Sequence, residues 1–161
     1  MVVVDSSVMI PLLRVGKLNL LKDFFGKINI TKDIRQEINE GKLGASEFEE
    51  AVNNWILVSN LKEGNIEKTA EQEGIENADV SVLFLARKKD NILLSNDYCL
   101  NMVAKAKGVK TWWLTTFIFE CIRKDILEKD EAKEILNDLI DKGMNPNKKV
   151  YSAVLRKIDG L

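Results

Sequence analysis

Histidine is absent from this sequence of 161 residues. Without histidine the chain can form no Ser-His-Asp or Cys-His catalytic arrangement, no imidazole base and no HExxH metal site. Its glycines form neither a GxGxxG fingerprint nor a phosphate-binding loop. Any enzymatic chemistry must therefore come from carboxylates, hydroxyls, lysines or a bound metal ion.

Cysteine is scarce, and long apolar runs are missing. Cys99 and Cys121 lie in apolar segments with helical patterning and have no CxxC spacing, so neither a zinc site nor a disulfide framework is predicted. No stretch approaches the roughly 18 consecutive apolar residues of a membrane span, and no basic segment precedes the apolar start. We therefore expect a cytoplasmic protein with no membrane partner.

Charge of one sign is not in excess either. The formal net charge is −1 and the pI is near 5.7. This balance gives no global basic field, so charge neither predicts nor excludes binding to nucleic acid. The length, with two prolines and no linker-like stretch, fits one folded unit with a core of its own.

What the sequence does contain is a regular alternation of short β-branched runs with longer helical patterns. Continuous apolar strands of this kind are typical of a parallel sheet that helices cover on both faces. We therefore predict a three-layer α/β/α fold with a five-stranded parallel sheet. The expected strands are residues 2–4, 28–30, 56–59, 91–95 and 110–114.

The pattern beyond about residue 124 is purely helical. One apolar stripe runs through residues 132–140 and another through residues 150–158, and the break GMNPN separates them. This pattern predicts a helical hairpin. We therefore expect a sheet domain over residues 1–124 and a helical extension over residues 125–161 packed on it.

Two of the predicted strands end in a carboxylate with hydroxyls close by. Asp5 follows the valines of VVVDSS, and Asp97 closes ILLSND. Both side chains would emerge at the carboxyl edge of the sheet. They converge on one cleft if the two strands are neighbours at the point where the strand order reverses.

Two predicted helices carry a carboxylate on the stripe expected to face the core. In TKDIRQEINEG, Glu37 shares this stripe with Ile34 and Ile38. In NADVSVLFLARKK, Asp79 is the first member of an i, i+3, i+4, i+7 set. We expect both acids to be carried toward the interior. The residues of the first helix expected to point away are Arg35, Gln36, Asn39 and Glu40.

Each acid taken singly has a plain structural explanation. Asp5 and Asp97 can each cap the helix that they precede, a contribution of about 1 kcal/mol. Asp79 can occupy a first helical turn, where the helix dipole favours an acid. Glu37 can pair with a lysine.

Taken together, the acids favour a metal site. Several buried like charges repel one another and lose hydration unless a cation compensates, and the sequence offers no histidine for that purpose. Mg²⁺ prefers carboxylate oxygens, and two such ions roughly 3.5 to 4 Å apart can activate water and stabilise the leaving oxygen of a phosphodiester. The predicted hydrolytic site consists of Asp5, Glu37, Asp79 and Asp97.

Four motifs in this order resemble those of the PIN domain nucleases, in particular the VapC-like branch of archaea and bacteria. They are VVVDSS, TKDIRQEI, ADVSVLFLARKK and LLSNDYCLNMVAKAKGV, within residues 1 to 120. The resemblance implies a PIN-like domain over residues 1–124 with strand order 3-2-1-4-5. It further implies Mg²⁺- or Mn²⁺-dependent cleavage of RNA, a homodimer, and a small antitoxin protein as partner.

The resemblance also assigns roles to residues. The acidic quartet of the family maps onto the four acids named above. Ser7 matches a hydroxyl that supports the first aspartate, and Ser95 matches the Thr or Ser two residues before the last one. Asn101 stands near the position of a further acid in some members, and its neutrality argues against a strongly held second metal ion.

Two other classes of function stay open. Receiver-like and haloacid-dehalogenase-like phosphoacceptor domains also carry an aspartate at the end of strand one. The local pattern argues against both, because a receiver requires an adjacent acidic pair and the dehalogenase pattern requires a second aspartate where this chain has Ser7. A catalytically silent binding module would keep the fold and use its exposed helices for partners. Metal-dependent cleavage distinguishes an enzyme from such a module.

Overall fold

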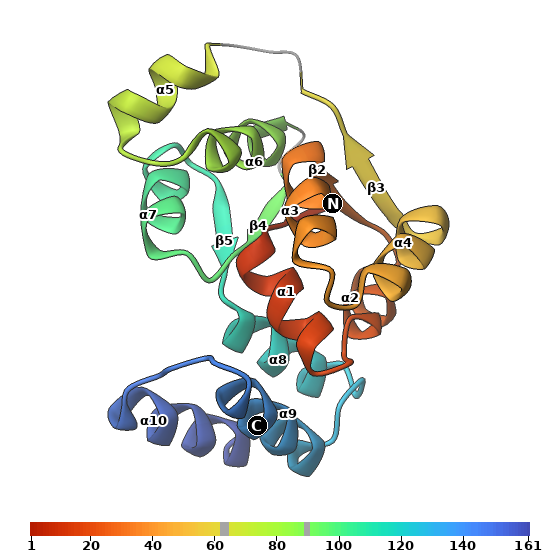
Figure 1. Ribbon diagram of the computed structural model, residues 1–161. Helices are drawn as coiled ribbons and strands as arrows, with labels where there is room; N and C mark the ends of the chain where they lie inside the picture. The colour runs from red at the N-terminus through yellow and green to blue at the C-terminus, as the bar shows by residue number, and fades with distance from the viewer. Residues whose placement is uncertain (62–64, 89–90) are drawn as a thin grey trace.

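The computed structural model describes residues 1–61, 65–88 and 91–161, so Lys89 of the third motif lies outside the described residues. The strands form one sheet in the order β3-β2-β1-β4-β5, and every neighbouring pair is parallel (Figure 1). This confirms the predicted five-stranded parallel sheet and its order. The strands are β1 (Val2–Val4), β2 (Ile28–Thr31), β3 (Ile56–Ser59), β4 (Ile92–Leu94) and β5 (Lys110–Trp112).

The central strands β1 and β4 are neighbours at the point where the strand order reverses. Val2 lies opposite Ile92 and Val4 lies opposite Leu94, so both strands end at the same level. The backbone N–H of Asp5 extends the pairing by donating to the carbonyl oxygen of Leu94 at 3.0 Å. This register places the residues that follow each strand side by side at the carboxyl edge of the sheet.

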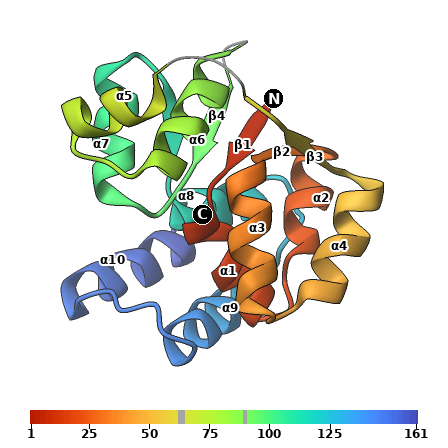
Figure 2. The ribbon, with the colours of Figure 1, turned by 45° about the horizontal axis from the view of Figure 1, so that its top comes forward.

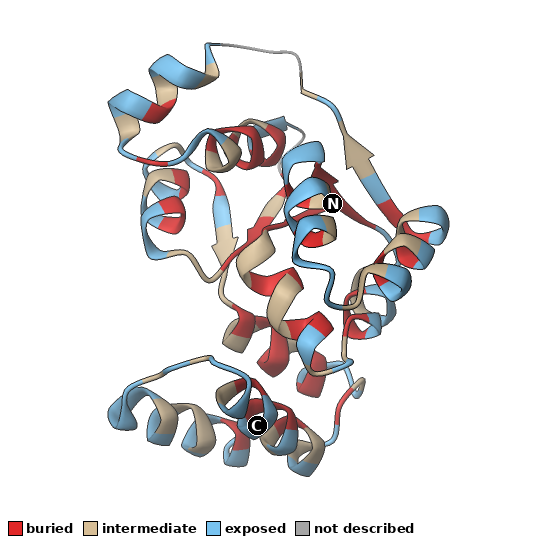
Figure 3. Ribbon diagram, in the orientation of Figure 1, coloured by how far each residue is buried: buried red, intermediate tan, exposed pale blue. Residues whose placement is uncertain are grey.

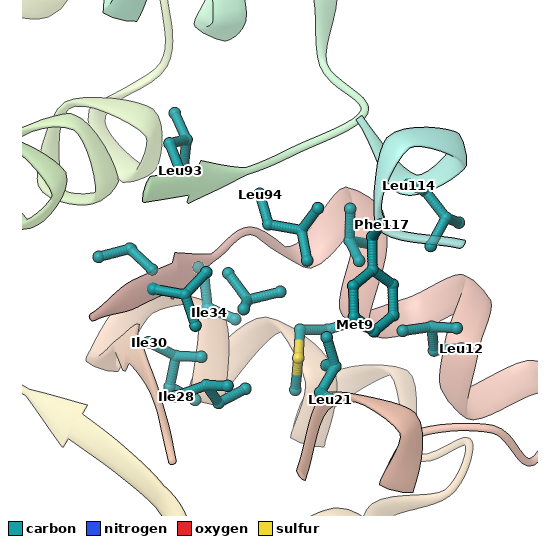
Figure 4. Packing of buried hydrophobic residues seen from close by; sticks show 14 of the residues in the cluster. Met9, Leu12, Leu21, Ile28, Ile30, Ile34, Leu93, Leu94, Leu114 and Phe117 are labelled. Atoms are coloured by element: carbon teal, nitrogen blue, oxygen red, sulfur yellow. The ribbon is translucent and has the colours of Figure 1, made fainter. Parts of the chain in front are cut away.

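Helices cover the sheet, and every residue of β1 and β2 is buried as a result. Figure 4 shows part of this core, in which Met9, Leu12 and Phe117 pack together beside Leu94. The helices before residue 125 are α1 (Ser6–Arg14), α2 (Asn19–Phe25), α3 (Lys32–Gly41), α4 (Ala45–Asn54), α5 (Ile66–Glu73), α6 (Asn77–Arg87), α7 (Tyr98–Ala106) and α8 (Leu114–Arg123).

Helix α3 differs from its predicted orientation on one side. Ile34 and Ile38 are buried as expected, but Arg35 and Asn39, expected to point away, both bind Glu49 of α4. The Arg35 guanidinium donates two hydrogen bonds, at 2.9 and 2.6 Å, and holds the pKa of Glu49 below its usual value. These contacts join α3 to α4.

The C-terminal residues form the predicted helical hairpin of α9 (Lys129–Asp141) and α10 (Lys148–Asp159). Helix α9 buries Ala132, Ile135 and Leu139 and packs on α1 and α8, whereas α10 packs on α9 (Figure 1). Figure 3 shows that α10 is largely exposed, and of its predicted stripe Ile158 is buried but Val150 is not. No helix in the described ranges has the length and apolar content needed to cross a bilayer.

Candidate active site at the carboxyl edge of the sheet

A cleft of about 980 Å³ opens beyond the ends of β1 and β4. Helices α3 and α6 pack on each other at this edge, and α5 and α7 both pack on α6 (Figure 2). These four helices, the start of α1 and the turn between α5 and α6 supply the lining. All four predicted acids, from four separate elements, line this one cleft: Asp5, Glu37, Asp79 and Asp97.

Asp5 is buried and serves as the N-cap of α1. Its Oδ2 atom accepts from the backbone N–H of Ser7 at 3.3 Å and from the Ser95 hydroxyl at 3.0 Å, and the Ser7 hydroxyl donates to it as well. The Ser95 hydroxyl in turn accepts from the backbone N–H of Asp97 at 3.0 Å. Two hydroxyls therefore join the end of β1 to the end of β4 through one carboxylate oxygen.

Asp97 and Asp79 also stabilise the helices on which they stand. Asp97 is the N-cap of α7, and its Oδ1 atom accepts from the backbone N–H of Leu100 at 2.6 Å. Asp79 occupies the third position of α6 in a capping box, and its Oδ2 atom accepts from the backbone N–H of Glu76 at 3.2 Å. The capping roles considered for these acids are therefore real.

Capping occupies only one oxygen of each aspartate. Within the described residues, Oδ1 of Asp5, Oδ2 of Asp97 and Oδ1 of Asp79 have no hydrogen-bond partner. No lysine or arginine of the described ranges forms an ion pair with any of these carboxylates. Each aspartate thus has one oxygen fixed by the fold and one oxygen left for a ligand in the cleft.

Asp79 shows the electrostatic cost of this arrangement. Burial raises the pKa of its carboxyl from an ordinary 3.8 to about 6. The N–H of Glu76 opposes the increase, and the negative charges of Asp5, Asp97 and Glu76 add to it. A cation bound among these groups would reverse the effect, because it would favour the ionised form.

Glu37 does not lie where the helical periodicity predicted. Its side chain is exposed at the wall of the cleft, so the expectation that it faces the interior is wrong. Ile34 and Ile38 lie on the side of α3 that packs on the core, whereas Glu37 lies on the side that lines the cleft. Glu37 makes no hydrogen bond or ion pair with another described residue.

The sequence predictions missed several residues that shape the site. Cys99, expected in apolar helical surroundings, is exposed and lines the cleft. Asn96 donates its backbone N–H to the Ser7 hydroxyl at 2.8 Å, and its Oδ1 accepts from the first N–H of α8 at 3.0 Å. Three further carboxylates of α5 and the turn after it also line the cleft: Glu67, Glu71 and Glu76.

Asn101 lies behind the acids rather than among them. It is fully buried, and its Nδ2 donates to the backbone carbonyl oxygen of Ser95 at 2.8 Å. Its Oδ1 is buried and has no hydrogen-bond partner within the described residues. The contact holds the turn between β4 and α7, and through Ser95 it fixes the position of Asp5.

Comparison with known proteins places the chain in a family. A family model, DUF3368, described as a PIN domain, matches residues 1–160. This chain belongs to the PIN domain family. No curated protein matches it. One solved structure, a domain of a functionally unknown protein from Methanocaldococcus jannaschii DSM 2661, is 21% identical, with 70% of this chain and 89% of that chain covered and a TM-score of 0.44.

The donor set of this PIN domain fits a hard divalent cation in its chemistry, because the four predicted acids bring carboxylate oxygens to the cleft. In the arrangement of side chains seen here, no three acidic, histidine or cysteine side chains of the described ranges are close enough to share a metal ion. The fold therefore brings the four acids into one cleft without closing them on one point.

The Ser95→Ala variant tests the hydroxyl network of the PIN domain. Ser95 is fully buried, and its hydroxyl bonds both Asp5 and the backbone of Asp97. We expect a loss of about 1 kcal/mol in the free energy of unfolding, measured by urea denaturation, because both former partners can still bond to other groups or to water in the cleft. Ser152→Ala, on the exposed side of α10, is the control and should change stability by less than about 0.5 kcal/mol. Equal changes in the free energy of unfolding for the two variants would show that the hydroxyl network of Ser95 does not stabilise the fold.

Proposed function

We propose that this PIN domain protein is a metal-dependent endoribonuclease that hydrolyses phosphodiester bonds in single-stranded RNA. One observation carries the proposal: four carboxylates from four elements line one cleft, and no lysine or arginine among the described lining residues compensates them. Helix capping alone does not explain why so many carboxylates without a compensating cation lie in one cleft. Binding of divalent cations does explain it.

The proposed roles follow from which oxygens are free. Asp5, Asp79 and Asp97 would hold Mg²⁺ or Mn²⁺ through the oxygens that do not cap helices. When bound, such a cation supplies a water of lowered pKa and neutralises charge on the scissile phosphate. Glu37, at the cleft wall, would ligate or orient that water. Ser7 and Ser95 fix the Asp5 carboxylate through its other oxygen.

The absence of histidine is consistent with this assignment. Proton transfer to and from the attacking water does not need an imidazole base when the water is already acidified. The exposed Glu37, at the wall of the cleft, is placed to accept a proton from that water. Carboxylates and water therefore suffice for hydrolysis.

The finer assignment to the VapC-like branch is part of the same proposal and rests on the sequence motifs. It makes the protein a cytoplasmic toxin that acts as a homodimer and is inhibited by a small antitoxin protein. The expected observation is a short reading frame beside the gene whose product copurifies with this protein and blocks RNA cleavage. A neighbouring product that binds without blocking cleavage would contradict the toxin role and leave the nuclease proposal standing.

The direct test is cleavage of an end-labelled single-stranded RNA, with separate reactions in Mg²⁺, in Mn²⁺ and in EDTA. We expect internal cleavage products with either metal and none with EDTA, resolved on a denaturing gel. Intact RNA under all three conditions would contradict the nuclease proposal and favour a catalytically silent binding module. Equal cleavage in EDTA would contradict the metal assignment.

A further inference from the structure

Ser7 borders two cavities of opposite character. On the acidic side it lines the cleft described above, and it also lines a second cavity of about 190 Å³. Helix α1 supplies Arg14 to this smaller cavity, and the turn that begins at the C-cap of α9 supplies Lys142 and Gly143. Asn96, from the turn after β4, also lines the small cavity.

The charges of the two cavities contrast. Arg14 and Lys142 are exposed, and neither forms an ion pair with another described residue. No described carboxylate lines the small cavity, whereas no described cation lines the cleft. Two uncompensated cations facing one small cavity make it a site for an anion.

The distance from the cleft suits a ligand that reaches both cavities. Arg14 lies two helical turns beyond Ser7, or roughly 10 Å along the axis of α1 at 1.5 Å per residue. The cavity holds the volume of about six waters at roughly 30 Å³ each, which is room for a phosphate group with a few waters. A chain of phosphates that starts in the cleft would therefore reach Arg14 within a few nucleotides.

We propose that Arg14 and Lys142 bind a backbone phosphate of the RNA strand next to the position that is cleaved. This inference deepens the proposed function and rests on it. An acidic cleft repels a polyanion everywhere except at a bound cation, so affinity for the rest of the strand has to come from basic side chains outside it. The guanidinium of Arg14 presents the donor geometry that phosphate oxygens match best.

The inference gives the C-terminal hairpin a role in binding substrate. Lys142 is the C-cap of α9, which packs on α1, and Leu139 of α9 is buried and lines the small cavity. The turn that follows contains Gly143, whose φ of 117° favours glycine, and a Cβ there would lie 4.0 Å from Nη1 of Arg14. The hairpin therefore supplies Lys142 to the phosphate site, and its turn at Gly143 lies close to Arg14, the other cation of the site.

A purely structural role for the two cations predicts a different result. Both stand at helix C-termini, where a positive charge offsets the helix dipole. That role would reduce stability when the charges are removed, but it would not change RNA binding. The two roles are separable because binding and melting are measured independently.

The test measures RNA binding by fluorescence anisotropy, with a labelled single-stranded RNA in EDTA so that no cleavage occurs, over a series of salt concentrations. The double variant Arg14→Gln/Lys142→Gln is compared with Lys22→Gln/Lys27→Gln, which removes two exposed cations outside both cavities. We expect the double variant to bind about tenfold more weakly than this control. The slope of log affinity against log salt should fall by about 0.7 for one lost phosphate contact.

A neutral methylphosphonate placed at successive positions in the RNA locates the contacted phosphate. One position should weaken binding to the wild type but not weaken binding to the double variant further. Equal affinity and slope for the double variant and the control would overturn the inference, as would a wild type that binds no RNA. Binding that depends on Arg14 and Lys142 in a protein that never cleaves RNA would overturn the nuclease proposal alone.

Discussion

Replacing Asp97 with asparagine should reduce cleavage of single-stranded RNA in Mg²⁺ by at least about 100-fold without disturbing the fold. The Oδ1 atom of Asp97 caps α7 by accepting from the N–H of Leu100, and asparagine keeps an oxygen for that bond. What the variant loses is the negative charge on the oxygen that has no partner in the described structure. Single-turnover rates on labelled RNA measure the effect, and Asp5→Asn should behave alike.

Melting temperatures with and without Mg²⁺ distinguish the two roles of Asp97, which are metal ligand and N-cap of α7. Without metal, Asp97→Asn should melt no lower than the wild type, since one of several repelling charges is gone, but Mg²⁺ should no longer stabilise it. Asp138→Asn, which removes an exposed carboxylate from α9, should keep both the cleavage rate and the stabilisation by Mg²⁺. A loss of about 1 kcal/mol with or without Mg²⁺, and normal cleavage, would assign Asp97 to capping alone.

The sheet could be predicted from the sequence because strands that are buried on both faces are written as unbroken apolar runs. Val2, Val3 and Val4 are an example, and β1 has the length that this run predicts. The last strand was predicted two residues too long, since β5 ends at Trp112 and Trp113 is already the N-cap of α8. The first N–H of that helix is bound by Asn96, a contact between segments that no local pattern indicates.

The candidate site was only partly predictable, because local patterns locate the ends of strands but not the contacts between separate segments. Strand ends locate Asp5 and Asp97 directly, because all the strands run in one direction. The burial of Glu37 was mispredicted because periodicity identifies the side of a helix that faces the protein but does not distinguish core from cleft. The acids of α5, such as Glu67, carried no signal, since this helix buries Ala70 alone among its residues. An ion pair of 2.6 Å joins Glu73, at the end of this helix, to Lys107, at the end of α7.

Asp79→Asn should stabilise the metal-free protein by about 2 kcal/mol at neutral pH. Its pKa is 3.8 in ordinary surroundings and about 6 in the folded protein, so the folded state binds more protons between these values. The wild-type free energy of unfolding therefore falls as pH rises from about 4 to about 6 and is level above that, relative to the variant. The full shift corresponds to ~3 kcal/mol, which solvent at the half-buried side chain reduces. Asparagine keeps an acceptor for the N–H of Glu76.

Urea denaturation in EDTA across this pH range measures the difference between the two proteins, in which the other titrating groups largely cancel. Mg²⁺ should change the result for the wild type, because a cation at the carboxylate competes with the proton. Its stabilisation of the wild type should be larger above about pH 6 than near pH 4.5, and Asp79→Asn should lose most of it at either pH. A stability difference that is constant across this range would show that Asp79 is not desolvated in the cleft. Its raised pKa could then no longer support a metal ligand at this position.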